Sequence, residues 1–273
     1  MYANKKRHGF TLVELLVVIA IITLLIAMTL PVLKTARDNA KTVVCSSNIK
    51  QTLDAFAVYE TQYRTFPNGD DIRPLQPPPP GGYVKGQTDK ASWWWFNLTG
   101  QFSGRDIKKR TALWCPSRNV KQLTPNINVL CANYGVNQAI CKSVLAFNKW
   151  ELLGTPLSSQ QIPQTSKTML VMDSGHALIM WLHATDTPPV VLTDKSTDSA
   201  YVPGLWINKD RVGHSVRAGL EFDAINGRHP QKSVNTGFID GHVERLKAND
   251  FYVGKTATGY TNRTPLWLPT QEP

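Results

Sequence analysis

Glu14 is the only ionisable side chain in a run of 24 residues, from Phe10 to Leu33, that is rich in apolar side chains. A lone charge at mid-bilayer is unfavourable by ~2.5–3.5 kcal/mol on insertion scales, so an acid in such a run usually marks a pairing site. Cleavage after Gly9 would supply a partner. Phe10 would then carry a positive amine one helical turn before Glu14, or opposite the Glu14 of a neighbouring copy.

The apolar run is long enough to cross a membrane as a helix. At ~1.5 Å rise per residue it reaches roughly 36 Å, against about 30 Å of hydrocarbon. We therefore expect a leader at residues 1–9 and a transmembrane helix at 10–33. The flanking basic residues do not settle its orientation, because three precede the run and three follow it: Lys5, Lys6, Arg7, Lys34, Arg37 and Lys41.

The residues Gly9, Phe10 and Glu14 resemble the class III signal of type IV pilins and type II secretion pseudopilins. The basic leader and Pro31, late in the apolar run, also match that pattern. The resemblance implies that a prepilin peptidase cleaves after Gly9 and methylates Phe10. It further implies a single-pass inner-membrane protein with a cytoplasmic leader and a periplasmic or cell-surface domain.

The partners implied by this resemblance are prepilin peptidase, other pilin or pseudopilin subunits, an inner-membrane assembly platform and membrane lipid. A plain signal anchor with an accidental acid is the alternative. An ordinary secretory signal is disfavoured, because its apolar stretch spans only about 7–15 residues and ends in a small-residue cleavage site.

The helix is expected to continue through a kink at Pro31 as an amphipathic segment, residues 34–66. Apolar and small residues recur at helical spacing along it, and proline and glycine after Phe66 end it. The expected apolar face comprises Ala36, Ala40, Val43 or Val44, Ser47, Ile49, Leu53, Phe56 and Tyr63.

Residues 67–273 are expected to form one globular pilin-like domain of the α+β class, a small and mainly antiparallel sheet packed on the helix. Strands are predicted at 168–172, 177–182 and 218–222. Asp240 and Gly241 suit a two-residue type I′ hairpin turn, with Phe238 facing Val243.

Further segments resemble a subgroup of large prepilin-like proteins. They are Cys45–Gln51, with Ile49 in place of the usual leucine, then Leu113–Ser117 and Asn133–Asn137. His229 with Asp240 and Gly241 is similar to the processing-associated motif of that subgroup, in which nine residues separate His from Asp-Gly. Here ten intervene, which favours a turn for Asp240 over a reacting centre.

Four cysteines follow the predicted span, and an oxidising compartment would favour up to two disulfides, with three possible connectivities. We expect Cys45 to pair with Cys115, and Cys131 with Cys141. A zinc site is not expected, because the chain has no close Cys-x-x-Cys pair and the ligand spacing is irregular.

An enzyme is not expected, and neither is a cofactor. Acid, hydroxyl and imidazole groups do occur, but no nucleophile elbow, zinc-protease helix, phosphate loop or dinucleotide fingerprint accompanies them. These candidate groups are Asp173, Ser174, His176, His214, His229 and Asp240.

The sequence therefore predicts a structural subunit of a type IV pilus or a type II secretion filament. The alternative is a membrane-anchored surface module that binds polysaccharide or DNA through Trp93–Trp95 and the positive charge. At least one of these tryptophans should lie near the surface if they form a strand. The net charge of +10 is scattered, so nucleic acid is not an expected partner.

Overall fold

A computed structural model describes residues 11–71, 93–100, 113–118, 133–143, 154–189, 200–205, 207 and 219–270. The chain divides into two compact units, Met1–Ala40 and Lys41–Pro273. Of the residues singled out above, Gly9, Phe10, Cys131 and His214 lie outside the described residues, as does the side chain of Trp93.

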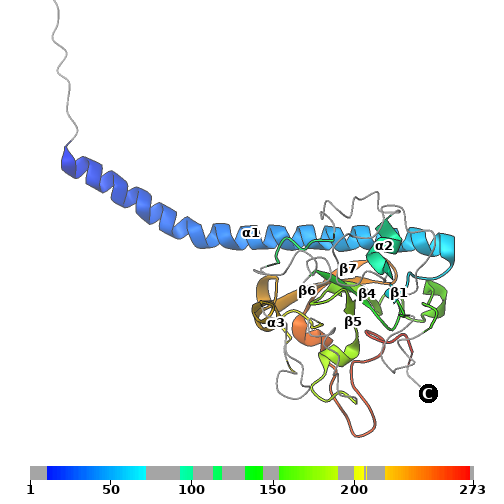
Figure 1. Cartoon of the computed structure of the whole chain (residues 1–273). Helices are drawn as coiled ribbons and strands as arrows, with labels where there is room; N and C mark the ends of the chain where they lie inside the picture. Colours follow the sequence, from blue (N-terminus) through cyan, green and yellow to red (C-terminus); the bar gives the residue numbers. More distant parts are fainter. Residues whose placement is uncertain are drawn as a thin grey trace, which may run out of the picture. The chain divides into compact units, whose positions relative to one another are not determined.

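One helix, α1 (Leu12–Tyr63), carries the apolar run from Leu12 onward and continues past Pro31, as expected (Figure 1). It ends three residues before the predicted boundary at Phe66. Arg64 there adopts a left-handed φ of 64°, and its N–H bonds the carbonyl of Glu60, an arrangement that commonly terminates helices.

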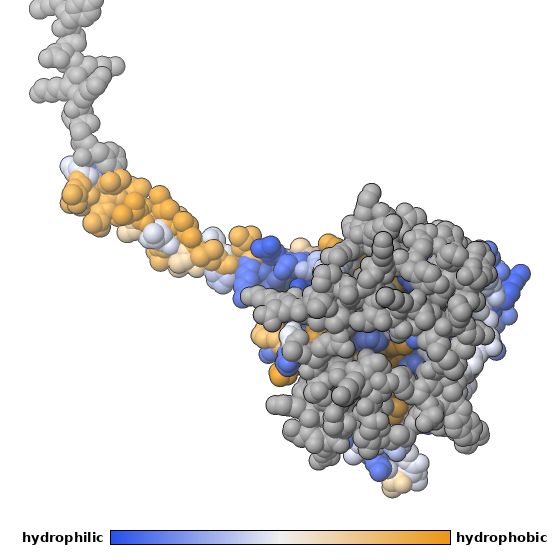
Figure 2. All heavy atoms as spheres, viewed as in Figure 1, coloured by the Kyte–Doolittle hydropathy of each residue, from blue (hydrophilic) through white to orange (hydrophobic). Residues whose placement is uncertain are grey.

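The N-terminal part of α1 is apolar and exposed. Its most apolar 18-residue window is 0% buried, and the helix is long and apolar enough to cross a membrane. Figure 2 shows one face of this segment, covered by apolar side chains. A helix that is apolar all round needs lipid or other helices as its surroundings.

The C-terminal part of α1 is amphipathic, but its buried face differs from the predicted one. Ile49, Leu53 and Phe56 are buried as expected. The other predicted members of the face are exposed: Ala36, Ala40, Val43, Val44, Ser47 and Tyr63. Four small or polar residues lie on the buried face instead: Thr42, Cys45, Asn48 and Thr52. Apolar character alone failed to identify this face, because specific hydrogen bonds and a tight fit allow polar groups there.

The main sheet has five strands in the order β5-β3-β4-β6-β7. Figure 1 labels four of them, β4, β5, β6 and β7. All neighbours are antiparallel except β3 and β5. The α+β class and the mainly antiparallel sheet are as predicted. The strands are β3 (Tyr134–Asn137), β4 (Met169–Asp173), β5 (Leu178–Ile179), β6 (Ser233–Phe238) and β7 (Val243–Lys247).

A second, two-stranded sheet pairs β1 (Asp70–Asp71) with β2 (Trp93–Trp94). Two short α-helices and four 3₁₀ turns complete the described elements. They are α2 (Trp95–Gly100), α3 (Glu221–Asn226), Ser159–Gln161, Trp181–Ala184, Pro230–Lys232 and Ala248–Phe251.

Two strand predictions need correction. The predicted strand 177–182 is confirmed only at β5, after which Trp181–Ala184 forms a 3₁₀ turn. The predicted strand 218–222 is wrong, because α3 begins at Glu221, with Glu221 and Asp223 in its first turn, where acids stabilise a helix.

The β6–β7 hairpin forms as predicted, but with a register shifted by one residue. Gly237, and not Phe238, lies opposite Val243. The N–H of Gly241 bonds the carbonyl of Phe238, and Gly241 has φ 89°. The connection is thus a three-residue loop with glycine in the left-handed position, not a two-residue type I′ turn.

Gly237 of β6 lies close beneath α1. A Cβ atom built there would lie 2.7 Å from Leu53 Cδ1 and 2.8 Å from Ile49 Cγ2, closer than real Cβ contacts. Glycine is needed here for close approach, and not for an unusual backbone conformation.

The tryptophans next to β2 belong to the core. Trp94 and Trp95 are buried, and Trp95 Nε1 donates to the carbonyl of Ala177 at 2.9 Å. These two rings therefore do not present the stacking surface that a sugar-binding or DNA-binding module would need.

A fully buried ion pair joins α3 to the strand ends. The Arg228 guanidinium donates to Asp223 at 2.8–3.1 Å and to the carbonyls of Asn133 and Ser174 at 2.6 and 2.8 Å. Asp223 also accepts from the Tyr201 hydroxyl at 2.7 Å. Burial lowers the pKa of Arg228, but Asp223 outweighs that effect and the net pKa lies above its ordinary value.

Filling the space at Gly237 should destabilise the protein. We expect Gly237→Ala to lower the free energy of unfolding by about 1–3 kcal/mol through overpacking against Ile49 and Leu53. The control is Gly259→Ala, because a Cβ atom there would meet nothing within 4 Å. Thermal unfolding of the detergent-solubilised full chain measures the stability of both variants. Equal melting temperatures for Gly237→Ala and Gly259→Ala would contradict the close contact of Gly237 with Ile49 and Leu53.

Removing one member of the buried ion pair should be more costly. We expect Arg228→Met to destabilise by about 3–5 kcal/mol, because it leaves Asp223 buried and unpaired. The Arg228→Met/Asp223→Asn double variant should be more stable than the single variant. The exposed pair Lys50–Asp54 is the control, since Asp54→Asn should change stability by only about 0.3–0.5 kcal/mol. Thermal unfolding measures these differences. Equal melting temperatures for the single variant and the double variant would refute the unpaired charge of Asp223 as the cause.

Candidate functional site

The acid predicted to pair with a neighbour takes part in a local cap in this chain. Glu14 Oε2 accepts from the Thr11 amide at 2.8 Å and from Thr11 Oγ1 at 2.7 Å. The Glu14 amide donates back to Thr11 Oγ1 at 3.3 Å. These reciprocal bonds form a capping box at the start of α1.

The capping box is a role for Glu14 that our sequence analysis missed. The Thr-x-x-Glu spacing before the apolar run was its signal. Glu14 is exposed, so its charge is not neutralised by a cation of the described chain in this arrangement. Capping and pairing with another copy are compatible, because the cap uses one of the two carboxylate oxygens.

The structure separates the members of the proposed His-Asp-Gly motif. Asp240 and Gly241 lie in the β6–β7 loop, where Asp240 Oδ1 accepts from the His242 amide at 3.1 Å and also bonds its imidazole. Gly241 contributes its carbonyl to Lys50 Nζ of α1 at 3.0 Å. The turn role expected for Asp240 agrees with this geometry, although the turn has a different type.

His229, in contrast, lies in the buried core, where the other motif segments meet. Asn48 of α1 donates to the carbonyl of Trp114 at 3.2 Å and to the Tyr134 hydroxyl at 3.3 Å. The Cys115 amide donates to Asn133 Oδ1 at 3.3 Å. The segments Cys45–Gln51, Leu113–Ser117 and Asn133–Asn137 are thus joined around one site.

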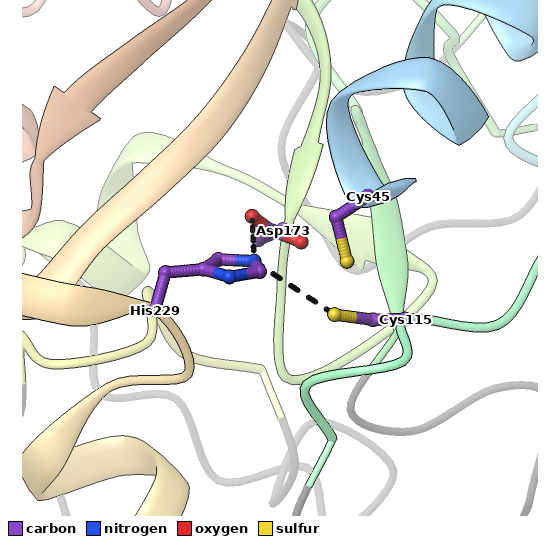
Figure 3. Close-up of side chains that lie close together, drawn as sticks. All are labelled: Cys45, Cys115, Asp173 and His229. Atoms are coloured by element: carbon purple, nitrogen blue, oxygen red, sulfur yellow. Dashed lines mark hydrogen bonds and ion pairs between the residues drawn. The ribbon is translucent and has the colours of Figure 1, made fainter. Parts of the chain in front are cut away.

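At this site the side chains of Cys45, Cys115, Asp173 and His229 point toward one another (Figure 3). One ligand atom from each lies within 4.8 Å of the other three, and all four residues are buried. His229 Nε2 is 3.0 Å from Asp173 Oδ2 and 3.8 Å from Cys115 Sγ. We name these four residues the core cluster.

Several neighbours hold the core cluster in place. Thr42 Oγ1 lies 3.0 Å from His229 Nδ1, and Asn235 Nδ2 lies 3.1 Å from His229 Nε2. The Asn235 amide donates to Asp173 Oδ2 at 2.7 Å. Four separate stretches of chain therefore supply the cluster: α1, the 113–118 segment, the end of β4 and the residue before Pro230.

Burial and charge act in opposite directions at the Asp173–His229 pair. Burial raises the pKa of Asp173, but His229, Arg228 and the Asn235 amide outweigh it, so the net pKa is below its ordinary value. Burial lowers the pKa of His229, but Asp173 outweighs it and brings that pKa to about 9. Each of the two side chains thus favours the charged form of the other.

The thiol of Cys115 is not set up as a nucleophile. Burial, a hydrogen bond with Cys45 and the charge of Asp173 raise its pKa well above the ordinary value. In a Cys-His-acid triad the acid and the thiol use different ring nitrogens. Here Asp173 and Cys115 both face Nε2, and the site is fully buried, so the geometry does not support nucleophilic catalysis.

The expected disulfide pairing has a mixed outcome. Cys45 and Cys115 do lie together, as the predicted pair requires, but both are free thiols in this structure, as is Cys141. The bond between Cys45 and Cys115 therefore stays a prediction. The Cys131–Cys141 pair cannot be placed, because Cys131 lies outside the described residues.

Asp173 was one of the catalytic candidates, and the structure gives it a place in the core cluster. The cluster's partners Thr42, Arg228 and Asn235 were not predicted from the sequence. Their signal was weak, since polar residues in a loop-rich sequence are normally solvated and only burial distinguishes these.

Comparison with known proteins supports the N-terminal interpretation. Residues 4–30 match the prokaryotic N-terminal methylation motif. No match was found among curated proteins or solved structures. The matched motif and the apolar N-terminal part of α1 support a membrane-anchored protein of the type IV pilin-like kind.

Proposed function

We propose that the chain is an assembly subunit of a type IV pilus or a type II secretion filament, processed by prepilin peptidase after Gly9. The observation that carries the proposal is the exposed apolar part of α1, most of which lies within the matched methylation motif. The large apolar side chains from Leu12 to Leu33 are all exposed, with exposed fractions of 43–78%.

That surface requires apolar surroundings. Burying apolar area contributes roughly 25 cal/mol per Å², so lipid before assembly and helices of other subunits after assembly both favour it over water. The segment has no polar stripe along which it would face solvent. A subunit that moves from membrane to filament therefore exchanges one apolar environment for another.

Glu14 would give this exchange a preferred register. Along an apolar helix surface, packing alone distinguishes axial offsets weakly. A carboxylate that meets the Phe10 amine of a neighbouring subunit favours one offset, because every other offset leaves two charges unpaired in a low-dielectric surrounding.

The remaining partners and the location follow from this role. We infer a single-pass protein of the inner membrane, with the leader in the cytoplasm and the domain in the periplasm or at the cell surface. Its partners are prepilin peptidase, an assembly platform, membrane lipid and other pilin-like subunits.

The first test is the N-terminus of the protein purified from membranes. We expect mass spectrometry to find N-methylated Phe10 as the first residue. An intact Met1, or a start beyond residue 30, would overturn the proposal.

The second test separates the charge of Glu14 from its role as a cap. Glu14→Gln removes the charge, but glutamine also serves in a capping box. We expect Glu14→Gln and Glu14→Ala to insert in the membrane normally and both to be depleted from filaments, measured as the ratio of variant to wild-type chain in sheared filaments. Thr11→Ala removes the cap and keeps the charge, and it should assemble.

Normal incorporation of Glu14→Gln would refute the pairing of charges. Loss of Thr11→Ala from filaments, together with retention of Glu14→Gln, would show that the cap alone matters.

A further inference from the structure

We propose that the core cluster is a structural zinc site. Its ligands are the sulfurs of Cys45 and Cys115, a carboxylate oxygen of Asp173 and Nε2 of His229 (Figure 3). The site lies entirely within the Lys41–Pro273 unit and is independent of the proposed role in assembly.

The number and kind of donor atoms suit zinc. Structural zinc is four-coordinate and tetrahedral, with sulfur at about 2.3 Å and nitrogen or oxygen at about 2.0–2.2 Å. Those bond lengths place neighbouring ligand atoms roughly 3–4 Å apart. Observed separations of 3.0 and 3.8 Å from His229 Nε2 fall in that range, and no pair in the cluster exceeds 4.8 Å.

The orientation of His229 is that of a metal ligand. Asp173 Oδ2 and Cys115 Sγ both approach Nε2, while Thr42 Oγ1 takes the Nδ1 side. Ligating histidines usually use one nitrogen for the metal and have the other held by a polar partner, which fixes the tautomer. Thr42 is thus a positioning residue for this site, and Asn235 Nδ2 would give up its contact with Nε2.

Asp173 offers a free donor atom in the buried cluster. Its Oδ1 is buried without a hydrogen-bond partner among the described residues, and its nearest ionic neighbour, Arg228 Nη1, is 4.0 Å away. Arg228 is already occupied by Asp223 and two carbonyls. An unsatisfied carboxylate oxygen in a protein core is unfavourable, and a cation held by either oxygen of this carboxylate would offset that cost.

The two sulfur donors decide which cation is expected. Thiolates favour zinc and other soft transition metals, whereas calcium and magnesium prefer oxygen-only sites. The irregular ligand spacing that argued against zinc in the sequence does not apply in three dimensions, because the fold brings the four residues together.

A Cys45–Cys115 disulfide is the competing state. It would use the same two sulfurs and bring them to about 2.05 Å, so the disulfide and the zinc site exclude each other. We favour zinc because His229 and Asp173 direct donor atoms into the same space, which a disulfide would not explain.

Metal analysis of the full chain tests the proposal. We expect the detergent-solubilised protein, purified without chelator, to contain about one zinc ion per chain by inductively coupled plasma mass spectrometry. Cys45→Ser and Cys115→Ser should reduce the zinc content to the level of the buffer. Cys141→Ser is the matched control and should keep it, because Cys141 is also a buried free thiol but is not in the cluster.

Two results would overturn the proposal. One is wild-type protein that stays free of zinc after reduction and incubation with zinc chloride. The other is a Cys45–Cys115 disulfide peptide found by mass spectrometry of protein that was alkylated on cell lysis.

Cobalt substitution is a second test, and it uses the wild-type protein, so it does not require the cysteine variants to fold. Cobalt bound to the wild-type protein should show the charge-transfer absorption of thiolate ligands, and zinc should displace it. Thr42→Val should weaken metal affinity by roughly 10–100-fold while the fold is kept, because only the partner of Nδ1 is lost. Cobalt bound without thiolate absorption would place the metal elsewhere and refute the site.

Discussion

The close contact between α1 and Gly237 of β6 is the constraint on which the domain depends. Ile49 and Leu53 lie so near the strand that no side chain fits between them. This contact sets the distance from helix to sheet, and that distance in turn allows the polar residues on the same helix face to reach their partners. On the buried face of this helix, Thr42 contacts His229 and Asn48 donates to the Tyr134 hydroxyl.

Buried polar chemistry then organises the ends of the strands. Arg228 and His229 are neighbours in sequence but enter different networks, one with Asp223 and the other with the core cluster. Asp173 adjoins both. A buried charge is tolerated only when it is paired or coordinated. These networks therefore restrict the loop before β6 to one conformation, as a hydrogen-bonded ladder does for a strand. The strands among the described residues are at most six residues long, and these networks add specific contacts between them.

The sequence predicted the long helix, the α+β class and β4 well, because a long apolar run and a compact β-branched and apolar segment leave few alternatives. It failed at the hairpin register for a physical reason. Gly237 has no side chain to mark a face, and Asp240-Gly241 suits both a two-residue and a three-residue loop, so neither pattern nor turn chemistry distinguished the two. Part of the core cluster was expected, because Cys45 was predicted to lie beside Cys115. That Asp173 and His229 join them could not be predicted, because the four residues share no local spacing and only the fold brings them together. The Arg228–Asp223 pair was hidden for the same reason, since charged residues in loops are ordinarily solvated.

The capping box at the start of α1 bears on what processing does to the helix. Both of its members, Thr11 and Glu14, lie after the proposed cleavage point, so removal of the leader takes away none of the groups that satisfy the first free amides. The peptidase would therefore release a helix whose first turn is already capped by hydrogen bonds. The new end of the subunit would not need to unwind when it leaves the enzyme.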